Sequence, residues 1–164
     1  MKNLFNIAIT VLLVCGCRNT VIESGDMTLS INADMHYKVE SAAEGAGAYH
    51  ADYQAADALI ADEVTIDRWN LRDVMKCDCE EGKKYTIRGT YAKDGFEVEK
   101  ILTVKVMNGF EGMVLVNSSY INHSDKVLTV KALESNRLSV ASDETIWSFQ
   151  PTSSSSRKDW ILPV

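Results

Sequence analysis

Apolar and polar residues alternate along much of this chain, which is the pattern of strands with one buried face and one solvated face. The alternation is clear in Met27–Ile31 and again in Met35–Val39. Between these runs, Asn32-Ala33-Asp34 offers residues that favour a turn. Together the two runs predict a β-hairpin.

The second half of the chain carries the most regular pattern. The runs Lys84–Tyr91 and Phe96–Val106 flank Asp94-Gly95, and Asp-Gly is a strong hairpin signal because glycine accepts a positive φ. Two further runs follow at similar spacing, Gly112–Ile121 and Lys126–Leu133. Strands joined by such turns predict a mainly all-β fold, an antiparallel β-sandwich, and not a parallel sheet with crossover helices.

Residues 41–82 are less regular. They begin with an alanine- and glycine-rich stretch, and a set of apolar residues at helical spacing follows, so a short surface helix and an irregular loop fit equally well. Glu63–Ile66 is predicted as a short strand that leads to Trp69. The residues with helical spacing are Tyr53, Ala56, Leu59 and Ile60.

The first residues have the features of a bacterial lipoprotein signal. A cationic start with Lys2 precedes the apolar run Leu4–Val14, and small residues lead to Cys17. A run of about eleven residues is shorter than the about 20 that a membrane-spanning helix needs. We expect a signal helix in residues 1–16, lipid on Cys17, a tether over 17–26 and a sandwich domain over 27–164 that is incomplete at its C-terminus. An ordinary secretory signal and a plain membrane helix are the alternatives.

Charge narrows the classes of partner. The formal net charge is −6, and removal of the leader with its one charged residue, Lys2, changes it to −7. An acidic chain without a basic cluster is not expected to bind nucleic acid or anionic lipid headgroups. Membrane attachment is therefore expected through Cys17 alone. Arg18 follows this cysteine where an inner-membrane retention signal would carry aspartate, which favours the outer membrane within a bacterial cell envelope.

Cysteines and histidines give no metal or redox motif. With Cys15 removed and Cys17 modified, Cys77 and Cys79 are the remaining thiols, spaced one residue closer than in a CxxC motif. In an extended strand both side chains would lie on the same face. We expect packed or exposed thiols there; the alternatives are a strained disulfide and a metal-binding site. His36, His50 and His123 show no ligand spacing. No metal and no cofactor are therefore expected.

Carboxylates are abundant, but no motif pairs them. A glycoside hydrolase needs two carboxyl groups that face each other across the sugar. No nucleophile elbow, phosphate loop or zinc-protease motif is present, so we expect no catalytic residue in this chain. We expect the carboxylates to be solvated on the surface; they include Asp57, Asp62, Asp67, Asp73, Asp78, Glu80 and Glu81.

Two tryptophans bracket a serine tract near the C-terminus. Indole rings stack on the C–H faces of sugars, and neighbouring polar groups bond sugar hydroxyls. The composition therefore suits a carbohydrate contact, with core packing of the two rings as the competing interpretation. The candidate contact residues are Trp147, Gln150, Arg157, Asp159 and Trp160.

Four segments together resemble the N-terminal β-sandwich of α-galactosidases of glycoside hydrolase family 36 and their melibiase-like relatives. The resemblance covers about residues 27–164 and is most specific over the last twenty or so. It implies a module that precedes a (β/α)₈ catalytic barrel and helps to shape the sugar pocket, while the catalytic carboxylates lie in that barrel. The segments are Glu99–Val104, Ser119–Ser124, Ile146–Gln150 and Arg157–Val164.

These observations predict a non-catalytic, lipid-anchored β-sandwich module that is associated with carbohydrate hydrolysis. Its partners would be the membrane, through Cys17, an oligosaccharide and a downstream catalytic barrel. The alternatives are a self-standing glycan-binding or surface-assembly lipoprotein and an inactive truncated remnant.

Overall fold

The computed structural model describes residues 19–41, 49–50, 52–93, 95–135, 137–139, 147–149 and 161–163. The regular secondary structure of these residues consists of β-strands, without a helix, so the predicted all-β fold is confirmed. The strands are β1 Thr20–Ser24, β2 Met27–Ile31, β3 Tyr37–Ser41, β4 Tyr49–His50, β5 Ala58–Ala61, β6 Val64–Ile66, β7 Asn70–Cys79, β8 Gly82–Lys93, β9 Phe96–Met107, β10 Leu115–Asn122, β11 Val130–Glu134, β12 Trp147–Phe149 and β13 Ile161–Pro163.

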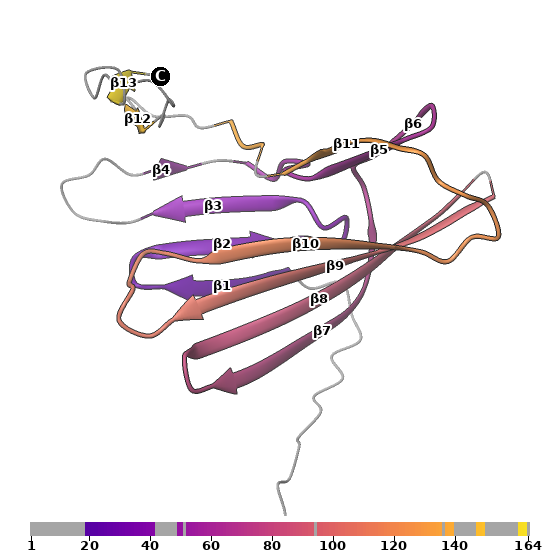
Figure 1. The fold of residues 1–164 in the computed structure, drawn as a ribbon. Helices are drawn as coiled ribbons and strands as arrows, with labels where there is room; N and C mark the ends of the chain where they lie inside the picture. The colour runs from indigo at the N-terminus through magenta and orange to yellow at the C-terminus, as the bar shows by residue number, and fades with distance from the viewer. Residues whose placement is uncertain are drawn as a thin grey trace, which may run out of the picture.

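The strands form antiparallel sheets, of which two have four strands. One has the order β1-β2-β3-β4 and the other the order β10-β9-β8-β7. A three-stranded sheet, β11-β5-β6, and the pair β12-β13 complete the described part. Figure 1 shows the two four-stranded sheets stacked face to face, with β5 and β11 beside the β10 edge. This is the layered arrangement of a β-sandwich.

Side chains from both four-stranded sheets form one apolar core. Burial of this kind contributes about 25 cal/mol for each Å² of apolar surface removed from water. The largest fully buried side chain among the described residues is that of Trp69, which lies just before β7 and is 0% exposed. Other core residues are Ile22, Leu29 and Ile31 on β1 and β2, and Ile87, Val98, Leu102 and Val104 on β8 and β9.

The β8–β9 hairpin is the longest pairing in the molecule and follows the predicted Asp-Gly turn. Its strands pair in register from Gly82 opposite Met107 to Lys93 opposite Phe96. Gly95 has a φ of +79°, the conformation for which glycine is favoured. In β9 the inward positions are Val98, Lys100, Leu102 and Val104, so the period of two places a lysine in the core.

A side-chain cap closes the predicted first hairpin. Asn32 Oδ1 accepts hydrogen bonds from the backbone N–H groups of Asp34 at 3.0 Å and His36 at 2.9 Å. Asparagine favours turns because it can replace backbone acceptors in this way. The turn also binds the second layer, since Trp69 N donates to Asp34 O at 3.0 Å.

The structure differs from the sequence prediction at several places. Thr20–Ser24, which we expected within the tether, is strand β1, because Ile22 is 0% exposed and packs in the core. The optional surface helix is not found: the described residues near Leu59 form strand β5. Strand β7 was not predicted because its sequence mixes charged residues with apolar ones and has no clear alternation. The expected signal helix in residues 1–16 lies outside the described residues.

Candidate functional site

A groove of about 680 Å³ lies between β10 and the segment that leads into β11. β10 contributes mainly hydroxyl and amide groups, and the opposite wall is aliphatic. Strands β5 and β9 close the inner end. The lining residues are Leu59, Val98, Ser118, Ser119, Tyr120, Asn122, Ser124, Asp125, Lys126, Val127, Leu128, Val130 and Leu133.

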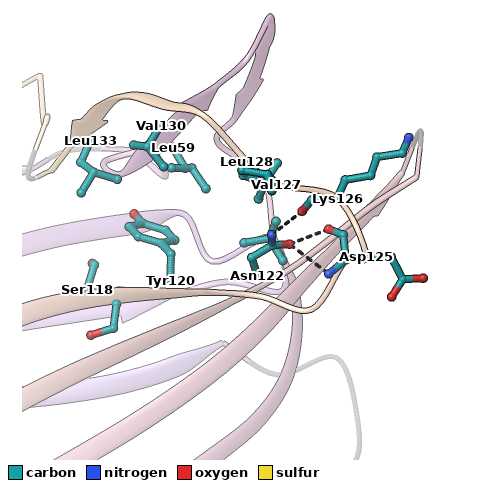
Figure 2. Close-up of a pocket in the computed structure, with 13 residues that line it drawn as sticks. Leu59, Ser118, Tyr120, Asn122, Asp125, Lys126, Val127, Leu128, Val130 and Leu133 are labelled. Carbon is teal, nitrogen blue, oxygen red and sulfur yellow. Dashed lines mark hydrogen bonds between the residues drawn. The ribbon is translucent and has the colours of Figure 1, made fainter.

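The aliphatic wall is open to solvent. Val127 is 89% exposed, Leu133 62% and Val130 53%. Figure 2 shows Tyr120 directed from β10 toward Leu133 and Val130 across the groove. Several large apolar side chains exposed together mark an interaction surface more often than single ones do.

The mouth of the groove is shaped by a turn after β10. Asn122 Nδ2 donates to the backbone carbonyl of Lys126 at 2.7 Å. Its Oδ1 accepts hydrogen bonds from Ser124 N at 2.9 Å and from Ser124 Oγ at 2.6 Å. Asn122 therefore fixes the chain reversal that carries Val127 and Leu128 to the other side of the groove from β10.

A buried polar cluster lies under the groove. Ser118 lines the groove, and its Oγ donates to Asp57 Oδ2 at 2.7 Å. Lys100 Nζ lies 2.8 Å from the same carboxylate oxygen, and Tyr37 OH donates a short hydrogen bond to it. Lys100 Nζ is also 5.2 Å from the centre of the Tyr37 ring and 6.0 Å from that of Trp69. A second, smaller hollow of about 200 Å³ reaches Asp57 between Ser118 and Leu133.

Burial and pairing act in opposite directions on this cluster. Burial alone would raise the pKa of Asp57, but Lys100 and the hydrogen bonds from Tyr37 and Ser118 outweigh it and lower that pKa. Burial lowers the pKa of Lys100, although Asp57 opposes the change. Burial, reinforced by Asp57, raises the pKa of Tyr37. Asp57 was predicted to be a solvated surface carboxylate; this is wrong, because the residue is 2% exposed and ion-paired.

Two aromatic side chains connect the cluster to the groove. The rings of Trp69 and Tyr120 have centroids 5.4 Å apart. Among the described residues, neither Trp69 Nε1 nor Tyr120 OH has a hydrogen-bond partner, although both atoms are buried. Burial, followed by the charge of Asp57, raises the pKa of Tyr120 to about 12. Tyr120 thus remains a neutral hydrogen-bonding group at the groove wall.

A separate ionic cluster lies on the outer surface near the β8–β9 turn. Glu99 Oε2 is 2.9 Å from His123 Nε2, and Glu99 Oε1 is 3.1 Å from Arg88 Nη1. The hydrogen bond from His123, with the help of Arg88, lowers the pKa of Glu99. Exposed pairs of this kind contribute little to stability. The cluster contains no nucleophile aligned with the histidine, and Ser124 bonds Asn122 instead.

None of the sequence-predicted site residues is among the described residues that line this groove. Cys17, Gln150, Arg157, Asp159 and Trp160 lie outside the described residues. Trp147 is placed by its backbone alone, in β12, opposite Pro163 of β13. The carbohydrate contact and the lipidation therefore stay predictions. The residues that line the groove were not predicted from the sequence. One usable signal was that the strand Leu115–Asn122 has no charged residue, which is unusual for a strand at a solvent-exposed edge.

The described residues of the groove favour apolar contact with a ligand over covalent or acid–base chemistry. Lys100 is 1% exposed and ion-paired, and the hydroxyl of Ser118 is bound to a carboxylate. Cys77 and Cys79 are free, exposed thiols on β7. Across the residues with described side chains, no three His, Cys, Asp or Glu residues gather as a metal site would require. The same part of the chain holds no helix that could cross a membrane.

Comparison with known proteins returned no match for this chain: no family model, no curated protein and no solved structure.

Proposed function

We propose that this chain is a non-catalytic, lipid-anchored β-sandwich module that accompanies a carbohydrate hydrolase and binds a protein partner through the groove beside β10. The observation that carries the proposal is the exposed aliphatic wall formed by Val127, Val130 and Leu133. Contact with a partner would remove this surface from water, at a gain of about 25 cal/mol for each Å² buried.

The composition of the groove favours a protein segment over a sugar. Sugar sites need an exposed aromatic face and several converging polar groups. Here the wall opposite β10 is aliphatic and the β10 wall carries hydroxyl and amide groups, but Tyr120 is half-buried and Trp69 is 0% exposed, so no open aromatic face is presented by the described residues. Aliphatic pockets of this kind instead suit Val, Leu or Ile side chains of another polypeptide.

The resemblance to family 36 α-galactosidases supplies the nature of the partner. In that family a catalytic barrel follows the N-terminal sandwich, so the partner would be a carbohydrate hydrolase. The leader ending in Cys17 supplies the location, the cell envelope and preferably the outer membrane. Both remain part of the proposal.

Site-specific crosslinking tests the proposed partner. Benzoylphenylalanine placed at Val127 in the full chain, in its native cell, should crosslink to a carbohydrate hydrolase. The matched control is the same photoreactive residue at Met75, which is 45% exposed on the distant strand β7. Crosslinks at Val127 to an unrelated protein, or equal crosslinks from both positions, would contradict the proposal.

The non-catalytic part has its own test. The purified chain is incubated with an aryl α-galactoside, and no turnover above buffer is expected. Turnover that follows this polypeptide through purification would overturn the proposal.

A second candidate function is glycan binding at the C-terminal tryptophans. The observation in its favour is that β12, which begins with Trp147, pairs with β13, which directly follows Trp160. Titration with galactose-containing oligosaccharides, followed by tryptophan fluorescence, separates the two functions. A saturable change lost in Trp160→Ala would favour the glycan-binding lipoprotein.

A further inference from the structure

The two edges of the β10-β9-β8-β7 sheet are protected to different degrees. Strand β7 carries Arg72, Asp73, Lys76 and Asp78, and its register with β8 shifts between Leu71 and Asp73. Charges and bulges on an edge strand prevent unwanted strand pairing. Strand β10 has eight residues, with no charged residue and no proline, and it pairs with β9 without a register shift.

The free edge of β10 lies at the groove. Among the described residues β10 forms a ladder with β9 alone, so its other edge presents backbone N–H and C=O groups. Consecutive residues Ser118, Ser119 and Tyr120 all line the groove, which means that the groove runs along the edge and not over one face. A row of backbone groups of this length that no described strand pairs with is a template for another strand.

The far side of the groove is also a strand edge. β11 is the outer strand of its sheet, and its residues Val130 and Leu133 line the groove opposite Tyr120. An occupant therefore has β10 on one side and an aliphatic wall on the other. A single extended segment meets this requirement. The β10 strand of a second copy does not meet it, because that strand is already paired with its own β9, which would have to occupy the space of the aliphatic wall.

We propose that this groove binds one extended strand of the partner polypeptide, paired through its backbone with β10. Alternate side chains of that strand would be apolar and would pack against Tyr120, Val130 and Leu133. This mode, in which a peptide adds a strand to a sheet, takes affinity from backbone hydrogen bonds and specificity from side-chain pockets. The inference rests on the proposed docking function and specifies the form of its partner.

The test uses a soluble synthetic nonapeptide that alternates valine and threonine and ends in lysines, added to the ¹⁵N-labelled full chain. We expect the largest amide shifts in Leu115–Asn122. Two control peptides carry N-methyl groups on alternate residues, one set on the valines and the other on the threonines, and each removes one row of N–H donors. One of them should bind at least tenfold more weakly than the other, because only one row of N–H donors faces β10.

Variants of the chain provide a second readout. Ser119→Lys places a charge at an exposed position of the edge and should weaken peptide binding at least tenfold. Met75→Lys, on the already charged β7, should leave binding unchanged. Circular dichroism confirms that both variants stay folded, as expected for exposed positions.

Several outcomes would overturn the strand proposal: no binding, equal binding of both N-methylated peptides, or shifts that centre on β7. Dimerisation of the chain that Ser119→Lys abolishes, with no competition from the peptide, would assign the edge to a second copy instead. If the peptide binds at β10 but Val127 gives no crosslink to a hydrolase, the proposed function is contradicted and the proposal that β10 binds a strand is supported.

Discussion

Lys100 Nζ lies 2.8 Å from Asp57 Oδ2, and the side chain of each residue is 1% exposed. A charge without its partner in such a place carries a large desolvation cost. The pair connects β9 to the residue just before β5, so it joins two sheets of the sandwich. It also lies directly below the groove, through the hydroxyl of Ser118.

Removing one member of this pair should destabilise the protein strongly. Lys100→Met leaves the Asp57 carboxylate buried without its cation, and we expect a loss of about 3–5 kcal/mol in the free energy of unfolding. The double variant Asp57→Asn/Lys100→Met keeps an acceptor for Tyr37 and Ser118 and should recover most of the loss. Urea denaturation measures both. A double variant as unstable as the single one would show that the ion pair itself is the main contribution.

The same pair should make stability depend on pH in the acid range. The pKa of Asp57 in the folded protein is below its ordinary value of 3.8, so the contribution is complete above about pH 4 and is lost as the pH falls through the folded pKa. Urea midpoints at pH 7, 5, 4 and 3 measure this. The double variant, which lacks both charges, should lose less stability between pH 4 and pH 3. An equal loss in both proteins would assign acid sensitivity to other carboxylates.

Gly82 should be the glycine least tolerant of alanine among those at turns. Its φ is +142°, and a Cβ there would lie 2.0 Å from the carbonyl oxygen of Val106. Gly109 is a matched control with a φ of +77° and no atom within 4 Å of a Cβ. We expect Gly109→Ala to cost about 1–2 kcal/mol and Gly82→Ala at least about 1 kcal/mol more, measured by thermal unfolding. Equal losses would show that Val106 moves away freely.

The groove wall should contribute to association and little to stability. Val127 is 89% exposed, so Val127→Ser should change the free energy of unfolding by less than about 0.5 kcal/mol. Fluorescence of an added hydrophobic dye should fall with this variant, because apolar surface is lost. Leu29→Ser, in the core at 2% exposure, is the opposite case and should unfold the domain and raise dye binding. Dye binding unaffected by Val127→Ser would place the apolar surface elsewhere.

Cys17 should determine attachment to the membrane. Metabolic labelling with an alkyne fatty acid is expected to mark the chain and to place it in the membrane fraction, since the leader predicts acylation of this thiol. Cys17→Ala should abolish both the label and the sedimentation with membranes. Cys15→Ala is the matched control and should keep both. Label retained in Cys17→Ala would contradict the lipoprotein interpretation.

The fold could be predicted where local signals agree. Alternation and the Asp-Gly turn predicted the β8–β9 hairpin, and Asn32 predicted the turn after β2, because these signals lie within a few residues. β7 could not be predicted in this way, since its charged and apolar residues show no clear alternation and its register is set by pairing with β8. Thr20–Ser24 was missed because a short strand next to a leader has too few residues to show a period.

The candidate site was harder to predict from the sequence than the fold, because it is formed by residues that are far apart in the chain. Nothing near Asp57 indicates that Lys100 will meet it. The one available signal was the period of β9, which places Lys100 among Val98, Leu102 and Val104 and so predicts a buried cation that needs a partner. The contact residues expected near Trp147 and Trp160 rest on composition and stay predictions.

The contrast between β7 and β10 has a consequence for how the molecule can assemble. A sheet can grow without limit by strand addition only when the edge strands on both of its sides accept a new strand. In this sheet the charges and the bulge of β7 protect one edge from pairing. This sheet therefore offers one receptive edge, at β10, and strand addition there does not continue through β7.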